Sequence, residues 1–255
     1  MKEHVLSCTG VVKTVPRSLR RWAALGSTAA LLASVACGSQ QPQEESTAAV
    51  QQPLDAGQYV LLNELKINPS GTDYPYEYIE LIGTPGLSLA GFQVVVIDAA
   101  TGTVKMVVDL GTACGGSACM IGTNGLLIIK ASDVDGGVVG HTPAAATTVV
   151  KDDQLRDTDV IPNNAAVLLV EGSTLIAENS TLTAGDAGSA VLPADDSLVD
   201  GVGWGASGGK YSGVTLTQSS GNPDAATRIP GRVDQTAGAW YNGDLLGQTD
   251  GGDFP

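Results

Sequence analysis

From residue 58 onward the sequence consists of short apolar runs separated by Gly, Asn, Asp and Pro. Short aliphatic runs bounded by such residues are typical of β-strands. The runs that we predict to be strands are 58–67, 76–82, 91–98, 103–110, 125–131, 147–151, 165–171 and 198–204. No long helical pattern separates them, so the chain is predicted to be all-β, an antiparallel sandwich or barrel, and not an α/β fold. The continuously apolar runs 94–97 and 126–129 are predicted to be central strands covered on both faces.

Residues 1–36 are predicted to be a lipoprotein signal peptide. A basic segment is followed by the apolar segment 22–36, which is too short to span a bilayer. Small residues stand directly before Cys37, an arrangement that resembles the lipobox of bacterial lipoproteins. We therefore expect Cys37 to be lipidated and to become the mature N-terminus. The alternative is ordinary cleavage after Ala36, which would leave a free thiol.

The remainder of the chain divides into a linker, one domain and a short tail. Residues 37–57 carry the lipidated cysteine and a polar, flexible linker, residues 58–247 form the β-domain, and residues 248–255 form a C-terminal tail. The formal net charge of the whole chain is −14, and removal of the basic signal peptide makes it more acidic. Such a surface repels nucleic acid and anionic lipid head groups. We expect membrane contact through the anchor alone and a protein or glycan partner at the envelope.

A disulfide is predicted between Cys114 and Cys119, which stand in the sequence CGGSAC between two strand-like runs. The two glycines allow a tight turn, and disulfides persist in extracytoplasmic proteins. Two thiols without further Cys or His nearby cannot complete a tetrahedral zinc site, so no metal is expected there.

Several short motifs follow one another in a familiar order. An apolar strand ends in Asn-Glu, a Glu-aromatic-aliphatic-Glu-Leu segment follows, then Leu-small-Gly-aromatic, and Asp-Gly-Val-Gly-Trp-Gly comes later. The residues that carry these motifs are Asn63, Glu64, Glu77, Glu80, Gly91, Phe92 and Trp204. Their order resembles the bacterial lamin tail domain, most closely the form that precedes some secreted bacterial nucleases. The resemblance implies an immunoglobulin-like β-sandwich used for binding or tethering, with these residues in structural roles. No nuclease domain is expected, because only the short tail follows.

No catalytic residues are predicted. His141 is the only histidine beyond the signal peptide, and we interpret it as an exposed loop residue, since no nucleophile elbow accompanies it. Glu77 and Glu80 are three apart on a predicted strand, so they should face opposite sides and not form a carboxylate pair. Trp204 and Trp240 are interpreted as buried anchors, with a glycan-binding platform as the alternative.

Acidic loops raise the question of calcium. The candidate ligands form two clusters in the sequence: Asp133 and Asp135 in the first, and Asp152, Asp153, Asp157 and Asp159 in the second. Calcium takes six to eight oxygen ligands, and clustered loop aspartates can supply them. Neither cluster matches an EF-hand loop, so solvated acidic loops are the favoured interpretation and no cofactor is expected.

These observations predict a non-enzymatic lipoprotein of the bacterial cell envelope, at the outer membrane or cell surface, whose lamin-tail-like sandwich binds or tethers a partner. One alternative is an accessory module that binds substrate for, or localises, a secreted hydrolase or nuclease. Another alternative is a calcium-dependent adhesion or matrix protein.

Overall fold

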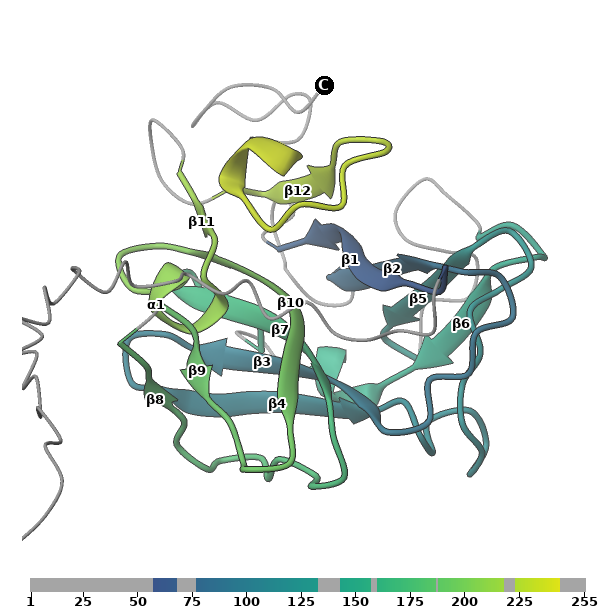
Figure 1. Cartoon of the computed structure of the whole chain (residues 1–255), viewed down its shortest axis with the longest axis horizontal. Helices are drawn as coiled ribbons and strands as arrows, with labels where there is room; N and C mark the ends of the chain where they lie inside the picture. Colours follow the sequence, from purple (N-terminus) through teal and green to yellow (C-terminus); the bar gives the residue numbers. More distant parts are fainter. Residues whose placement is uncertain are drawn as a thin grey trace, which may run out of the picture. The chain divides into compact units, whose positions relative to one another are not determined.

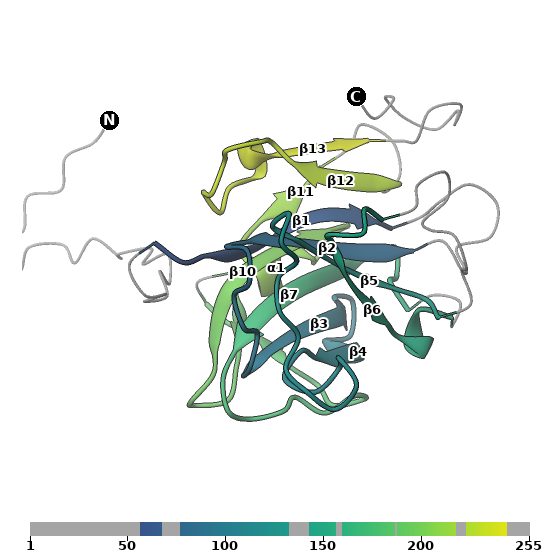
Figure 2. The ribbon, with the colours of Figure 1, turned by 90° about the vertical axis from the view of Figure 1, so that its right-hand side faces the viewer.

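The computed structural model of the chain describes residues 57–67, 77–132, 143–156, 160–186, 188–217 and 223–243. All of them belong to one compact unit, Ser46–Pro255. Figures 1 and 2 show this unit from two directions as strands stacked in layers.

Two sheets form the main body of the fold. The six-stranded sheet has the order β13-β12-β1-β2-β5-β6. Its strands are β1 (Val60–Lys66), β2 (Tyr78–Gly83), β5 (Leu126–Lys130), β6 (Thr148–Lys151), β12 (Ala225–Arg228) and β13 (Trp240–Gly243). The five-stranded sheet has the order β11-β10-β7-β3-β4. Its strands are β3 (Phe92–Asp98), β4 (Thr103–Asp109), β7 (Ala165–Glu171), β10 (Ser197–Trp204) and β11 (Thr215–Leu216).

A small outer layer completes the described part of the chain. It contains the two-stranded sheet of β8 (Thr183–Ala184) and β9 (Ala190–Val191) together with the four-residue helix α1 (Gly209–Ser212). Two short 3₁₀ helices, η1 (Asp153–Arg156) and η2 (Ala237–Ala239), lie in connections. Every predicted strand is present with its ends within two residues of the predicted ones.

The all-β sandwich expected from the sequence is confirmed. The pairings between described strands are antiparallel except at two sheet edges, where β6 runs parallel to β5 and β11 runs parallel to β10. Each parallel strand is reached by a crossover connection, as parallel pairing requires, and not by a tight hairpin turn. The sandwich therefore has mixed sheets where a purely antiparallel one was expected.

The main hydrophobic core lies between the two sheets and includes Leu62, Leu65, Ile79, Leu81 and Trp204, all of which are fully buried. A second apolar cluster lies on the other face of the five-stranded sheet. Residues of β8 and β9 and the segment between β7 and β10 pack against this cluster, and Figure 1 shows α1, β8 and β9 beside that sheet.

Because the five-stranded sheet has a core on each side, its central strands β3 and β7 are buried on both faces. The prediction for the run 94–97 is thus confirmed. The run 126–129 is largely buried too, but it belongs to β5, which lies next to the edge strand β6 and not at the centre of its sheet.

A buried ion pair joins the two sheets. Asp200 of β10 and Arg228 of β12 approach to 2.5 Å, and their side chains are 1% and 2% exposed. The Asp200 carboxylate also accepts hydrogen bonds from the backbone N–H groups of Leu62 and Gly201, both at 2.9 Å. The Arg228 Nε donates to the Leu62 carbonyl at 2.7 Å, and the guanidinium lies 4.6 Å from the ring centroid of Trp240.

Irregularities in β1 and β10 bring these groups together. The pairing register shifts between Leu62 and Glu64 of β1 and between Leu198 and Asp200 of β10. Bulges of this kind bend a strand and redirect a side chain. We call Asp200, Arg228 and the Leu62 backbone the inter-sheet latch.

Candidate functional site

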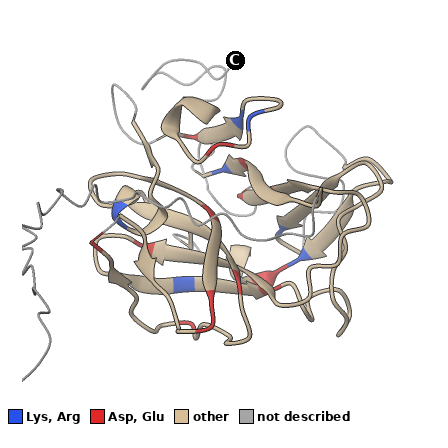
Figure 3. Ribbon diagram, in the orientation of Figure 1, with Lys and Arg blue, Asp and Glu red and all other residues tan. Residues whose placement is uncertain are grey.

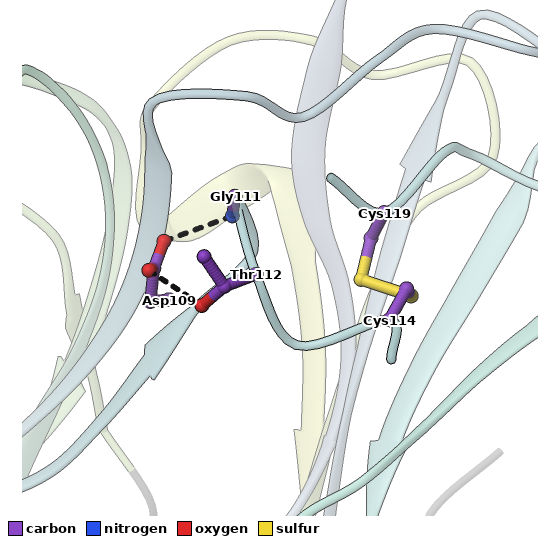
Figure 4. The surroundings of a disulfide bond; sticks show 5 residues. All are labelled: Asp109, Gly111, Thr112, Cys114 and Cys119. Atoms are coloured by element: carbon purple, nitrogen blue, oxygen red, sulfur yellow. Dashed lines mark hydrogen bonds between the residues drawn. A yellow bond between two sulfur atoms is a disulfide. The ribbon is translucent and has the colours of Figure 1, made fainter. Parts of the chain in front are cut away.

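The predicted disulfide is present and closes the loop between β4 and β5. Cys114 and Cys119 are bonded, with their Cα atoms 5.1 Å apart, and Cys119 is fully buried in the main core. The loop leaves β4 through Asp109, whose carboxylate accepts hydrogen bonds from the Gly111 N–H at 2.9 Å and the Thr112 hydroxyl at 2.7 Å. Figure 4 shows these bonds and the disulfide farther along the same loop. The bond fixes the loop to the core.

Three of the motif residues are structural anchors. Gly91 has φ +81°, a conformation that favours glycine, and it admits the chain to β3, where Phe92 enters the main core. Trp204 is fully buried and donates from its indole nitrogen to the Pro162 carbonyl at 3.1 Å. Trp240 is 5% exposed. The interpretation of both tryptophans as buried anchors is confirmed, and neither ring is available as a glycan platform.

The other motif residues gather on the outer face of the six-stranded sheet, except Glu77, which is buried just before β2. Glu64 of β1 and Glu80 of β2 are direct partners in the pairing register. The Asn63 amide donates to Glu80 Oε1 at 2.7 Å. Glu64 accepts from the Tyr78 hydroxyl on one oxygen and from the Thr227 hydroxyl on the other, the second at 3.4 Å.

These acids line a pocket of about 340 Å³, which we call the outer-face pocket. It is lined by Glu64, Tyr78, Glu80, Asn124, Leu126, Ile128, Pro143, Ala144 and Thr147. The sheet supplies the floor, and the turn before β5 and the segment before β6 supply the walls. The Asn124 amide donates to the Thr147 hydroxyl at 2.7 Å, which ties the two walls together. The volume lies within the range of ligand-binding pockets.

Burial and like charge dominate the electrostatics of this floor. Burial raises the pKa of Glu80, and the neighbouring charge of Glu64 raises it further, while the Asn63 hydrogen bond opposes the shift. Burial and Glu64 also raise the pKa of Tyr78, so its hydroxyl keeps its proton and donates to Glu64. Burial lowers the pKa of Lys66, against the charges of Asp224 and Glu64.

Each of β1, β4, β5, β6 and β12 carries one basic residue, drawn in blue in Figure 3. Three of these residues are neighbours across the six-stranded sheet, because Lys66 and Lys130 are the partners of Tyr78 in the pairing register and Lys151 is the partner of Lys130. None of them lines the outer-face pocket. The polar groups of the pocket floor are the carboxylates of Glu64 and Glu80 and the Tyr78 hydroxyl, which donates to Glu64.

Two of the calcium candidates are described. Asp152 accepts from the Gln154 N–H at 2.8 Å, and Asp153 accepts from the Ser132 hydroxyl. Within the described ranges, no group of three or more His, Cys, Asp or Glu is arranged to hold a metal ion. Asp133, Asp135, Asp157 and Asp159 lie outside the described residues, as do Cys37 and His141.

The pairing of Glu64 with Glu80 was not foreseen in the sequence. Spacing along one strand led to a comparison of Glu77 with Glu80, whereas the neighbour of Glu80 stands on the adjacent strand. The alternation of polar and apolar residues in β1 and β2 carried a signal, because two consecutive strands often form a hairpin. Their register, which includes a bulge, had to come from the structure.

No protein-family model matches the chain, and no curated protein or solved structure matches it. The lamin tail resemblance accordingly remains a prediction from the motifs. Among the helices of the described residues, none is long and apolar enough to cross a membrane.

Proposed function

We propose that this protein is a non-enzymatic, lipid-anchored binding protein of the bacterial cell envelope, whose lamin-tail-like sandwich holds a partner. The observation that carries the proposal is the outer-face pocket, an acceptor-lined hollow of about 340 Å³ on the face of a rigid sheet. Polar groups on paired strands are held in place by the sheet, which favours recognition of a partner over a loosely defined contact.

Sequence and structure both support the envelope setting. Small residues precede Cys37 after a basic and an apolar segment, and a polar linker follows. The Cys114–Cys119 disulfide favours an oxidising compartment, since cytosolic thiols are kept reduced.

Metabolic labelling with an alkyne analogue of palmitate tests the anchor. The wild-type chain should be labelled and should sediment with membranes, whereas Cys37→Ala should lose both properties. Cys8→Ala is the matched control, because Cys8 lies within the predicted signal peptide and should leave labelling unchanged. Labelling of the Cys37→Ala chain, or none in the wild type, would contradict the anchor.

Crosslinking on intact cells tests the binding role. Wild-type protein should yield one recurrent envelope partner in roughly equal amount, and Glu80→Gln should reduce its recovery while the disulfide loop and fold remain intact. A recurrent hydrolase that is captured equally by both chains would instead favour the accessory-module alternative.

A further inference from the structure

The lining of the outer-face pocket divides into two chemically different parts. The β1 and β2 side of its floor presents the carboxylates of Glu64 and Glu80 and the Tyr78 hydroxyl, which donates to Glu64. Its apolar part consists of Leu126 and Ile128 on the β5 side of the floor and of Pro143 and Ala144 on the wall beside it. An occupant that fills this pocket must offer hydrogen-bond donors at one end and an apolar body along its length.

No lysine or arginine is among the residues that line the pocket. Glu64 and Glu80 are directly opposite each other, so their Cβ atoms are about 5 Å apart, a spacing at which like charges destabilise a sheet. Among the described residues, Glu80 has one hydrogen-bond partner, the Asn63 amide on Oε1, and its Oε2 accepts from none. Lys66 lies two positions farther along β1, opposite Tyr78 in the pairing register, where it interacts with the charges of Asp224 and Glu64, and it does not line the pocket.

We propose that the outer-face pocket receives a lysine side chain from a partner protein, with the ammonium between Glu64 and Glu80 and the methylene stem along the apolar wall. Charge complementarity selects the cationic head, and a long side chain with an apolar stem matches the wall. This inference rests on the proposed function, because it names the chemistry by which the envelope partner is held.

The hydrogen bonds already made on the floor favour an ammonium over a guanidinium. Both oxygens of Glu64 already accept hydrogen bonds, from Tyr78 and Thr227, and one oxygen of Glu80 accepts from Asn63, so neither carboxylate offers two unoccupied oxygens. A guanidinium binds best to both oxygens of one carboxylate, whereas an ammonium directs three separate donors to different acceptors.

Saturation-transfer NMR on the purified, detergent-solubilised lipoprotein tests the inference. The probes are acetylated, amidated Ala-Ala-Lys-Ala-Ala and its norleucine and arginine counterparts. We expect saturation of the lysine methylene protons and none for norleucine. Glu80→Gln and Glu64→Gln should each weaken lysine-peptide binding by about three- to tenfold, the loss of one charge-assisted hydrogen bond in a partly exposed site.

The control variant is Glu171→Gln. Glu171 is another half-buried glutamate, at the end of β7 in the other sheet, and burial raises its pKa as it does that of Glu80. The substitution removes the same charge from the whole protein, so unchanged binding excludes a general effect of net charge. Gln at position 80 keeps an oxygen for the Asn63 amide, and unfolding temperatures of the variants check that the fold is retained.

Three results would overturn the inference: equal binding of the norleucine peptide, tighter binding of the arginine peptide, or no binding of the lysine peptide. In the last case, saturation transfer to N-acetylglucosamine, added as a glycan probe, would show that the pocket binds a sugar. These outcomes are independent of palmitate labelling. If the wild type is labelled by palmitate but does not bind the lysine peptide, only the proposed lysine site is refuted. If the wild type binds the peptide but is not labelled, only the proposed lipid anchor is refuted.

Discussion

The inter-sheet latch allows a sharp test of what holds the sandwich closed. The substitution is Asp200→Asn, which keeps the size of the side chain and removes its charge. In the wild type the Asp200 carboxylate accepts from Arg228 and from the backbone N–H groups of Leu62 and Gly201. After substitution, the Arg228 guanidinium keeps its bond to the Leu62 carbonyl but remains a buried charge without a counter-ion.

The size of the effect follows from burial. Both side chains of the pair are at most 2% exposed, and breaking a buried pair on one side costs about 3–5 kcal/mol of unfolding free energy. The matched control is Asp234→Asn. Asp234 forms an ion pair with Arg232 in which the side chains are 39% and 47% exposed, so its loss should cost far less than the loss of the buried pair.

Urea unfolding followed by tryptophan fluorescence measures both variants. The double variant Asp200→Leu/Arg228→Met should recover much of the lost stability, because an apolar pair leaves no charge buried. The reasoning would be refuted if Asp200→Asn cost no more than Asp234→Asn. It would also be refuted if the double variant lost more unfolding free energy than Asp200→Leu and Arg228→Met lose together as single substitutions.

Three further predictions concern the disulfide, the pocket floor and two glycines. Replacing Cys114 and Cys119 by Ala should lower the unfolding free energy by about 2 kcal/mol, as short-loop closure entropy implies, and should abolish the response of the urea midpoint to reductant; an unaltered midpoint on reduction of the wild type would contradict this. The pKa of Glu80 is raised in the folded state, so the folded protein binds this proton more tightly than the unfolded chain does. The free energy of unfolding therefore falls as the pH rises from the unfolded pKa of Glu80 to its folded pKa. Glu80→Gln should therefore raise the melting temperature at pH 7 with little effect near pH 4, and an equal effect at both pH values would count against it. Gly102→Ala should destabilise more than Gly116→Ala in thermal melts, because both have positive φ but only at Gly102 does a backbone carbonyl lie 2.5 Å from the new Cβ; equal losses would refute the steric argument.

The sequence was most informative where strand signals are local. The eight predicted apolar runs correspond to β1 to β7 and β10. Aliphatic runs between turn residues can be recognised as strands without knowing which strands they pair with. β8, β9 and β11 are two residues long, too short for any periodicity. β12 and β13 carry few β-branched residues, and they are strands because β12 pairs with the edge of β1 and β13 pairs with β12.

The candidate site was harder to predict because it depends on pairing between strands. Asn63, Glu64 and Glu80 were singled out as motif residues, yet their meeting on one face depends on the register of β1 and β2 and on a bulge. Asn124 and Thr147 enter the pocket from connections whose path has no periodic signal. The Asp200–Arg228 pair links residues on different sheets, and no local pattern marks either as the partner of the other.

The position of β1 has a consequence for how the chain folds. β1 is the first strand in the sequence, yet it is hydrogen-bonded between β2 and β12, and Glu64 reaches Thr227 across 163 residues. The six-stranded sheet therefore cannot close until the last part of the domain has been synthesised. Such long-range closure slows folding and leaves the first strand with one unpaired edge in the meantime. In the exported lipoprotein that we propose, this delay would keep the chain unfolded until β12 and β13 are available to complete the sheet.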